Sequence, residues 1–171
     1  MKKLSLLACI AVLCASTSVA QAQSSDWTPG LYVQAGVVPL TLKYNQYNYA
    51  LGTTATVAMG YDFHKNLAGE VLYARTSTTD YSTTLSFAAF YLKPKYQIND
   101  TFEVHGKVGT NNMTIETTYG AADRNFTSYG VGMTAYISDD KKNFLSVDYM
   151  VWGKNNGYSL VSPSLTFGRK F

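Results

Sequence analysis

Seven ionisable side chains have spacings that would allow them to act together. They are Glu70, Lys93, Lys95, Glu103, His105, Lys107 and Asp148. The five between positions 93 and 107 all occupy odd positions, so an extended backbone would turn them to one face. Opposed ammonium and carboxylate groups can form buried ion pairs, which offsets the high cost of removing each charge from water. We therefore expect a structural salt-bridge network, and the alternative is a charged constriction that admits ions.

The pairing of these charges depends on the register across the turn near Asn99. One register places Lys95 opposite Glu103, and a register shifted by two places Lys95 opposite His105. Both registers keep the charged side chains on the same face, because side chains alternate with a period of two. The sequence therefore predicts one polar layer and leaves its pairing open.

Catalytic and metal-binding patterns are missing from the sequence. Neither His64 nor His105 has histidine, cysteine or carboxylate partners at the usual ligand spacing. Glu103 and His105 would share a strand face, but a salt-bridged histidine explains that pair more simply. Neither histidine belongs to a His-x-Ser pair of the kind that a lipid A deacylase would need. We expect no enzymatic activity, no metal and no cofactor.

The elements that must carry these residues read as eight strands, with no sustained helical spacing of apolar residues. In the second segment Ala55, Val57 and Met59 alternate with Thr54, Thr56 and other small residues, which gives one apolar and one polar face. The predicted segments are 30–43, 52–63, 67–77, 84–98, 101–117, 126–138, 143–153 and 157–171.

The breaks between these segments alternate in length. Compact polar turns are predicted at 62–66, 98–101 and 138–143, and longer loops at 44–51, 77–83 and 118–125, with a tighter one at 153–157. Outer-membrane barrels have short turns on the periplasmic side and longer loops outside. Eight antiparallel strands that close into a barrel leave no sheet edge, so no backbone N–H or C=O group at an edge lacks a hydrogen-bond partner in lipid. The fold expected is therefore an all-β, eight-stranded, up-and-down transmembrane β-barrel.

The composition agrees with this fold. Only 15% of the 171 residues are charged, while 14% are aromatic and 14 residues are Tyr; soluble domains average about a quarter charged. Apart from the N-terminus, no segment approaches the roughly 18 apolar residues of a spanning helix. A soluble eight-stranded barrel that binds a ligand in the periplasm is the structural alternative, but it would have an apolar interior. The many charges on the polar face favour the membrane barrel.

The first 22 residues read as a cleaved secretory signal peptide. Lys2 and Lys3 precede an apolar stretch, and Ala20-Gln21-Ala22 provides the cleavage site. Both cysteines lie within this peptide, so the mature chain would contain no thiol. Removing the two lysines lowers the net charge from +3 to +1 (3 − 2), too small for a nucleic-acid partner. The expected organisation is a signal peptide (1–22), a polar lead-in (23–29) and the barrel (30–171).

Aromatic residues gather at both ends of the predicted strands, as membrane interfaces favour. Those expected at the short-turn ends are Tyr61, Phe63, Tyr96, Phe102, Phe144 and Phe171. Those expected toward the long loops are Tyr44, Tyr47, Tyr49, Tyr73 and Tyr81.

Three segments resemble the small outer-membrane β-barrel domain family, which includes the N-terminal barrel of outer-membrane protein A and the opacity-type proteins. They are Gly30–Gly36, Leu67–Tyr73, in which Glu70 lies between apolar or small residues, and Leu165–Phe171. The resemblance implies a bacterial outer-membrane location, with contact to outer-membrane lipid including lipopolysaccharide. The C-terminal segment looks like the signal read by the barrel-assembly machinery. The residues that match this signal are Val161, which precedes the segment, and Leu165, Phe167 and Phe171 within it, and Arg169 departs from the pattern.

Three functional hypotheses follow. The first is a structural or surface-interaction barrel whose lumen is filled and whose loops 44–51 and 118–125 contact surface ligands. The second is a narrow channel for ions or small solutes. The third is the soluble periplasmic ligand-binding barrel.

Overall fold

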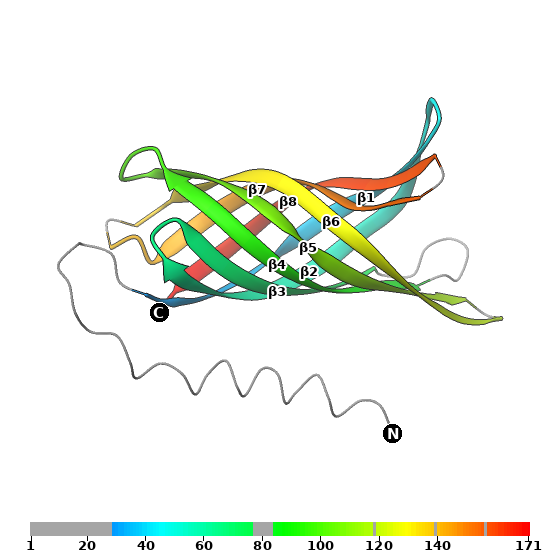
Figure 1. Ribbon diagram of the computed structural model, residues 1–171, viewed down its shortest axis with the longest axis horizontal. Coiled ribbons are helices and arrows are strands. Elements are labelled where there is room, and N and C mark those ends of the chain that lie inside the picture. The colour runs from blue at the N-terminus through cyan, green and yellow to red at the C-terminus, as the bar shows by residue number, and fades with distance from the viewer. Residues whose placement is uncertain (1–28, 77–83, 118, 139, 156) are drawn as a thin grey trace, which may run out of the picture.

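The computed structural model describes residues 29–76, 84–117, 119–138, 140–155 and 157–171. Each strand is hydrogen-bonded to the next, and the last is hydrogen-bonded to the first, so the sheet is a closed antiparallel barrel of eight strands (Figure 1). This confirms the predicted fold class. The predicted signal peptide (1–22), nearly all of the lead-in (23–29) and Tyr81 lie outside the described residues.

The strand bounds agree with the predicted segments except at two hairpins. The strands are β1 (Leu31–Tyr44), β2 (Tyr47–His64), β3 (Leu67–Thr76), β4 (Thr84–Gln97), β5 (Phe102–Thr117), β6 (Gly120–Tyr136), β7 (Asn143–Asn155) and β8 (Tyr158–Lys170). Among these described residues there is no helix of a length and apolarity suited to crossing a bilayer.

The two hairpins that differ are those expected to be long loops. The segments 44–51 and 118–125 are mostly strand, because β2 already begins at Tyr47 and β6 at Gly120. The Tyr, Asn and Thr residues of these segments continue the backbone pairing between the two strands of each hairpin. Asn45 (φ 52°) and Gly120 (φ 146°), at the turns, have a positive φ. These hairpins project from the end of the barrel opposite the C-terminus (Figure 1). The long-loop end thus carries extended hairpins.

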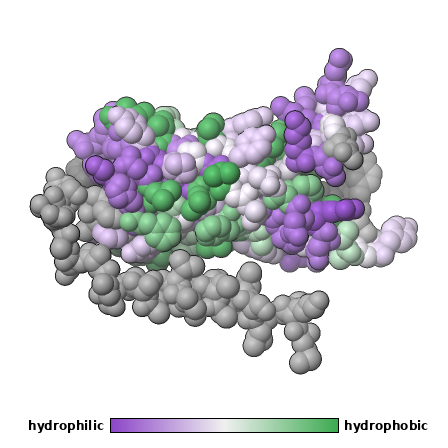
Figure 2. Space-filling view, viewed as in Figure 1, coloured by the Kyte–Doolittle hydropathy of each residue, from purple (hydrophilic) through white to green (hydrophobic). Residues whose placement is uncertain are grey.

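The outer surface of the barrel is apolar around its middle. Outward side chains such as Val57, Phe90 and Leu165 are 53%, 48% and 46% exposed, while their strand neighbours turn inward. In the face that Figure 2 shows, hydrophobic residues occupy the middle and hydrophilic residues gather toward both ends. This arrangement suits a wall surrounded by lipid, with its two ends in water.

The interior has two chemically different halves. Toward the short turns it is polar and charged, as expected. Toward the long-loop end it is filled by an apolar plug that the sequence did not predict. The plug comprises Val38, Leu40, Ala58, Leu72, Ala74, Leu85, Phe87, Ala89, Tyr91, Met150, Trp152 and Leu160. The β7–β8 register shifts between Val151 and Gly153, so Trp152 is the extra residue of a bulge.

Candidate functional site

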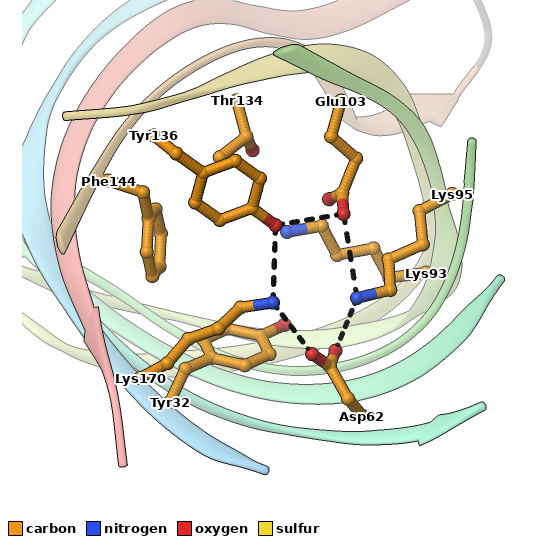
Figure 3. Close-up of a pocket in the computed structure, with 9 residues that line it drawn as sticks. All are labelled: Tyr32, Asp62, Lys93, Lys95, Glu103, Thr134, Tyr136, Phe144 and Lys170. Atoms are coloured by element: carbon orange, nitrogen blue, oxygen red, sulfur yellow. Dashed lines mark hydrogen bonds and ion pairs between the residues drawn. The ribbon is translucent and has the colours of Figure 1, made fainter. Parts of the chain in front are cut away.

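Five side chains from five strands form a closed ring across the lumen near the short turns. We call Asp62, Lys95, Glu103, Tyr136 and Lys170 the lumen ring. Lys95 Nζ lies 2.7 Å from Asp62 Oδ1 and 3.6 Å from Glu103 Oε2. Tyr136 donates to Glu103 Oε2 over 3.0 Å, and Lys170 Nζ donates to Tyr136 Oη (3.2 Å) and to Asp62 Oδ2 (2.9 Å). Figure 3 shows these contacts closing on themselves inside the barrel wall.

A second group of charges lies next to the ring, further from the short turns. We call Glu70, His105, Lys107 and Asp148 the buried charge cluster. Lys107 Nζ lies 2.8 Å from Glu70 Oε1 and 3.4 Å from Asp148 Oδ1. His105 Nε2 lies 2.6 Å from that same Asp148 oxygen. All four residues are at most 5% exposed, so the ion pairs of Lys107 and the contact between His105 and Asp148 are shielded from bulk water.

The carboxylate of Glu70 is the most completely satisfied group in this cluster. Besides Lys107, it accepts hydrogen bonds from Tyr32 Oη (2.9 Å) and Gln34 Nε2 (3.1 Å), both at Oε2. The side chain is 0% exposed. Three donors therefore meet at one carboxylate and join three strands, since Glu70 lies on β3, Tyr32 and Gln34 on β1, and Lys107 on β5.

Lys93 lies between the two groups. Its side chain is buried, and its Nζ is 5.2 Å from the centre of the Tyr32 ring. Among the described residues no carboxylate lies within ion-pair distance of this amine. The lumen nevertheless balances in charge, because the lysines 93, 95, 107 and 170 face four carboxylates, those of residues 62, 70, 103 and 148. The attraction between these carboxylates and the Lys93 amine acts over a longer distance than an ion pair, and it helps to hold the amine inside the narrow lumen.

The structure brings all seven sequence-predicted polar residues into the lumen. Lys95 pairs with His105 across the β4–β5 turn, which selects the second of the two registers left open. Sequence reasoning missed Asp62, Tyr136, Lys170, Tyr32 and Gln34. The alternation of side chains along each strand was the signal that could have identified them. Asp62 lies two residues after the inward Gly60, and Lys170 lies two residues after the inward Gly168. Asp62 was placed on the polar face of segment 52–63 and also counted in the turn 62–66, and it was left out of the predicted network.

One aromatic assignment needs correction. Phe144 was predicted at the membrane interface, but it is 2% exposed and lies inside the barrel, with its ring edge-on to Tyr32 and Tyr136. The alternation along β7 is as predicted, with Leu145 outward; Phe144 shares the parity of the inward Ser146 and therefore faces the lumen. Val161 lies on the same face as Leu165 and is 6% exposed, and its part in the assembly signal stays a prediction.

The other assigned aromatic residues lie on the outer surface. Phe63, Tyr73, Tyr96 and Phe102 are exposed, and Tyr61 packs edge-on against Phe63 at 5.4 Å. Leu165, Phe167 and Phe171 are also exposed. Whether these residues meet lipid headgroups or the assembly machinery stays a prediction.

Two small cavities lie inside the lumen. One cavity, of about 10 Å³, lies at the lumen ring and is lined among others by Lys93 and Thr134. A second of about 10 Å³ lies between the buried charge cluster and the apolar plug, next to Thr56, Lys107 and Trp152. Each has about the volume of one water molecule. No group of histidine, cysteine and carboxylate side chains within the described ranges is arranged to hold a metal.

Outside the barrel wall, an ion pair links two of the short turns. Lys141 Nζ lies 2.8 Å from Asp100 Oδ1, joining the β6–β7 turn to the β4–β5 turn. The hydrogen bond from Lys141 lowers the pKa of the Asp100 carboxyl. The Ser138 hydroxyl and the Lys142 amide likewise lower the pKa of Asp140. Because both carboxylates are solvent-exposed, these contacts shape the turns and add little stability.

Comparison with known proteins agrees with this geometry. The family model for the outer membrane protein beta-barrel domain matches residues 5–171. No curated protein matches the chain in sequence. Solved structures share its fold at low identity. Ail, the attachment invasion locus protein of Yersinia pestis, was solved with the heparin analogue sucrose octasulfate; it has a TM-score of 0.62 and 15% identity, covering 85% of this chain and 100% of Ail.

Two further barrels are similar. Neisserial surface protein A has a TM-score of 0.63 and 15% identity, over 85% of this chain and 100% of its own. The N-terminal barrel domain of Pseudomonas aeruginosa OprF has a TM-score of 0.56 and 11% identity, over 81% and 97%. These likenesses concern the fold, and the bacterial outer membrane is the location that the family indicates. With a matching family model over nearly its whole length and a closed barrel with an apolar exterior, the chain belongs to the outer membrane protein beta-barrel domain family.

Proposed function

We propose that this protein is a closed outer-membrane barrel with a structural and surface-interaction role, and that it does not conduct ions. The wall anchors the protein in lipid, and the hairpins at the long-loop end present its contact surface. The observation that carries this proposal is the filled lumen. The lumen ring, the buried charge cluster and the apolar plug follow one another along the axis. The cavity at the ring and the cavity between the cluster and the plug each have room for about one water.

An ion that crossed this lumen would meet two different barriers. It would first have to separate ion pairs that are buried and hydrogen-bonded on several sides, such as Lys107 with Glu70. It would then have to pass the packed side chains of Phe87, Met150 and Trp152, which offer no ligand for a charge. The second barrier distinguishes this lumen from a simple charged constriction and disfavours the channel hypothesis.

Planar-bilayer recordings test the proposal. Purified protein reconstituted in the bilayer is expected to give flat current traces, and Glu103→Ala and Lys95→Ala variants are expected to stay flat because the apolar plug remains in place. Steady single-channel steps from the wild-type protein, altered in size by either substitution, would contradict it. Cold-SDS migration of each sample, before and after boiling, checks that the recorded protein is folded.

The proposed contact surface is the pair of hairpins at 44–51 and 118–125. Tyr47 and Tyr49 are 66% and 51% exposed there, and Tyr and Asn are residues that suit adaptable polar contacts. The fold is shared with Ail, which was solved with a heparin analogue, and this supports ligand contact by the hairpins. Surface-attachment assays with Tyr47→Ser/Tyr49→Ser cells are expected to show reduced binding, and undiminished attachment would remove this part of the proposal.

Export and assembly complete the proposal. We infer cleavage after Ala22, which leaves 171 − 22 = 149 residues, followed by insertion by the barrel-assembly machinery through the C-terminal Leu165, Phe167 and Phe171. The intact mass of the protein purified from outer membranes checks the cleavage site. A mass that retains residues 1–22 would contradict it.

A further inference from the structure

Two tyrosine rings stack on each other where the first and last strands of the barrel meet. Tyr44 ends β1, Tyr158 begins β8, and the two residues lie directly opposite each other in the register of these strands. The ring centres are 4.1 Å apart, and the ring planes differ by 16°. The two side chains also share a hydrogen bond. We call Tyr44 and Tyr158 the tyrosine pair.

The two rings point in the same direction, because their backbones lie side by side and their hydroxyl groups meet. Parallel rings with neighbouring hydroxyls bring the ring carbons beside each hydroxyl, the ortho carbons, close to those of the other ring. These carbons carry much of the unpaired electron when a tyrosine is oxidised to its phenoxyl radical. The tyrosine pair therefore has the geometry for a carbon–carbon bond between two oxidised tyrosines.

The tyrosine pair is open at the long-loop end of the barrel. Tyr158 is 45% exposed, and Tyr44 is half-buried. Tyr158 lies on the same face of β8 as Leu160 of the apolar plug, so the pair stands above the plug at the mouth of the barrel. In Figure 1 the β1–β2 and β7–β8 hairpins project together at this end. Outer-membrane barrels turn their longer loops to the medium outside the cell, so a water-soluble oxidant can reach the pair.

A third tyrosine shows that the stacking is selective. Tyr47 of β2 lies opposite Tyr44 on its other side, as Tyr158 of β8 does. Among the described residues, however, Tyr158 alone stacks on the Tyr44 ring. Register by itself therefore does not produce the contact, and Tyr47 provides a matched control.

We propose that oxidation joins Tyr44 to Tyr158 through a dityrosine bond that locks β1 to β8. The oxidant is hydrogen peroxide used by a haem peroxidase in the surrounding medium. Each phenol gives up one electron and one proton, which together reduce one peroxide to two water molecules. The two phenoxyl radicals then couple through their ortho carbons, and the hydrogen on each coupled carbon moves to the ring oxygen and restores the phenol. The proposal depends neither on a closed lumen nor on ligand contact by the hairpins.

Oxidation of the folded protein in detergent micelles with hydrogen peroxide and a haem peroxidase tests the proposal. Dityrosine fluorescence is expected to appear, and a tryptic digest is expected to contain residues 44–65 joined to residues 155–169 with the loss of two hydrogen atoms. Tyr158 is the single tyrosine of the second peptide, and fragmentation identifies its partner in the first. The bond would close a loop of 114 residues (158 − 44 = 114). Because this restricts the unfolded chain, the folded band on an SDS gel is expected to persist to a temperature about 10 °C higher.

Variants that keep the ring and remove the phenol identify the residues involved. Tyr44→Phe and Tyr158→Phe are each expected to abolish the dityrosine fluorescence, whereas Tyr47→Phe is expected to leave it unchanged. Wild-type protein unfolded in urea before oxidation is expected to yield little of the joined peptide, because the fold brings the two rings together. Undiminished fluorescence in Tyr158→Phe, a bond from Tyr158 to Tyr47, or dityrosine confined to covalent dimers would overturn the proposal. Unheated SDS gels confirm that every variant is folded before oxidation.

Discussion

Replacing Glu70 with Gln is expected to lower the free energy of unfolding by about 3–5 kcal/mol, the usual cost of removing one partner from a buried ion pair. The change preserves the shape of the side chain and removes its charge. Lys107, 2.8 Å away, would keep only Asp148 at 3.4 Å, and Lys93 would lose an attracting carboxylate in a closed space. Urea unfolding in detergent micelles, followed by tryptophan fluorescence, measures the effect.

A matched control separates burial from charge. Glu116 is also paired with a cation, but its side chain is 52% exposed and its contact with Arg75 is 3.8 Å long. Glu116→Gln is therefore expected to cost less than about 1 kcal/mol. If Glu70→Gln cost no more than Glu116→Gln, the buried charge cluster would not contribute to stability. The double variant Glu70→Gln/Lys107→Met is expected to recover part of the loss, because it removes the charge left without its partner.

Replacing Trp152 with Ala is expected to cost about 3–5 kcal/mol, as is usual for a large aromatic residue in a packed interior. Trp152 is 2% exposed and lies in the middle of the apolar plug, with its ring 5.4 Å from that of Phe87. Its indole nitrogen donates to Ser162 Oγ over 2.6 Å, and its backbone carbonyl accepts from Asn111. The substitution would leave a cavity and remove the partner of Ser162.

The loss of stability in Trp152→Ala is measured as the temperature at which the folded band on an SDS gel converts to the unfolded band. Urea unfolding monitored by circular dichroism supports this measurement. Tyr47→Ala is the control, since Tyr47 is 66% exposed on a hairpin and its loss is expected to change stability by no more than about 0.5 kcal/mol. Conversion of Trp152→Ala at the wild-type temperature would show that the apolar plug is not packed as described.

The sequence predicts the faces of the strands well, because a period of two assigns each side chain to one side of the wall. Glu70, Lys107 and Asp148 were placed in the lumen on that basis alone, and the structure has them there. The sequence predicts less well which residues lie opposite each other on neighbouring strands. Both registers near Asn99 satisfy the alternation, and only the folded hairpin selects Lys95 opposite His105.

The apolar plug shows a second limit of pattern reasoning. Leu40, Leu72 and Phe87 come from different strands, and each has an apolar or small neighbour on the outward face as well. Where both faces of a strand are apolar, alternation cannot distinguish a lumen residue from a lipid-facing one. Strand ends are the third limit. Asp62 and Phe144 both adjoin turns, and the position next to a turn, more than the parity along the strand, decided how they were assigned.

The central claim is that apolar side chains face lipid while the lumen is closed around its own residues. Quenching by lipids with brominated acyl chains tests it most directly. In a Trp27→Phe background, Trp152 is the single tryptophan, and its fluorescence is expected to be almost unchanged by brominated lipid. In a Trp27→Phe/Trp152→Phe background, a Phe90→Trp substitution on the outer wall is expected to be strongly quenched. Strong quenching of Trp152 with none at position 90 would contradict the account.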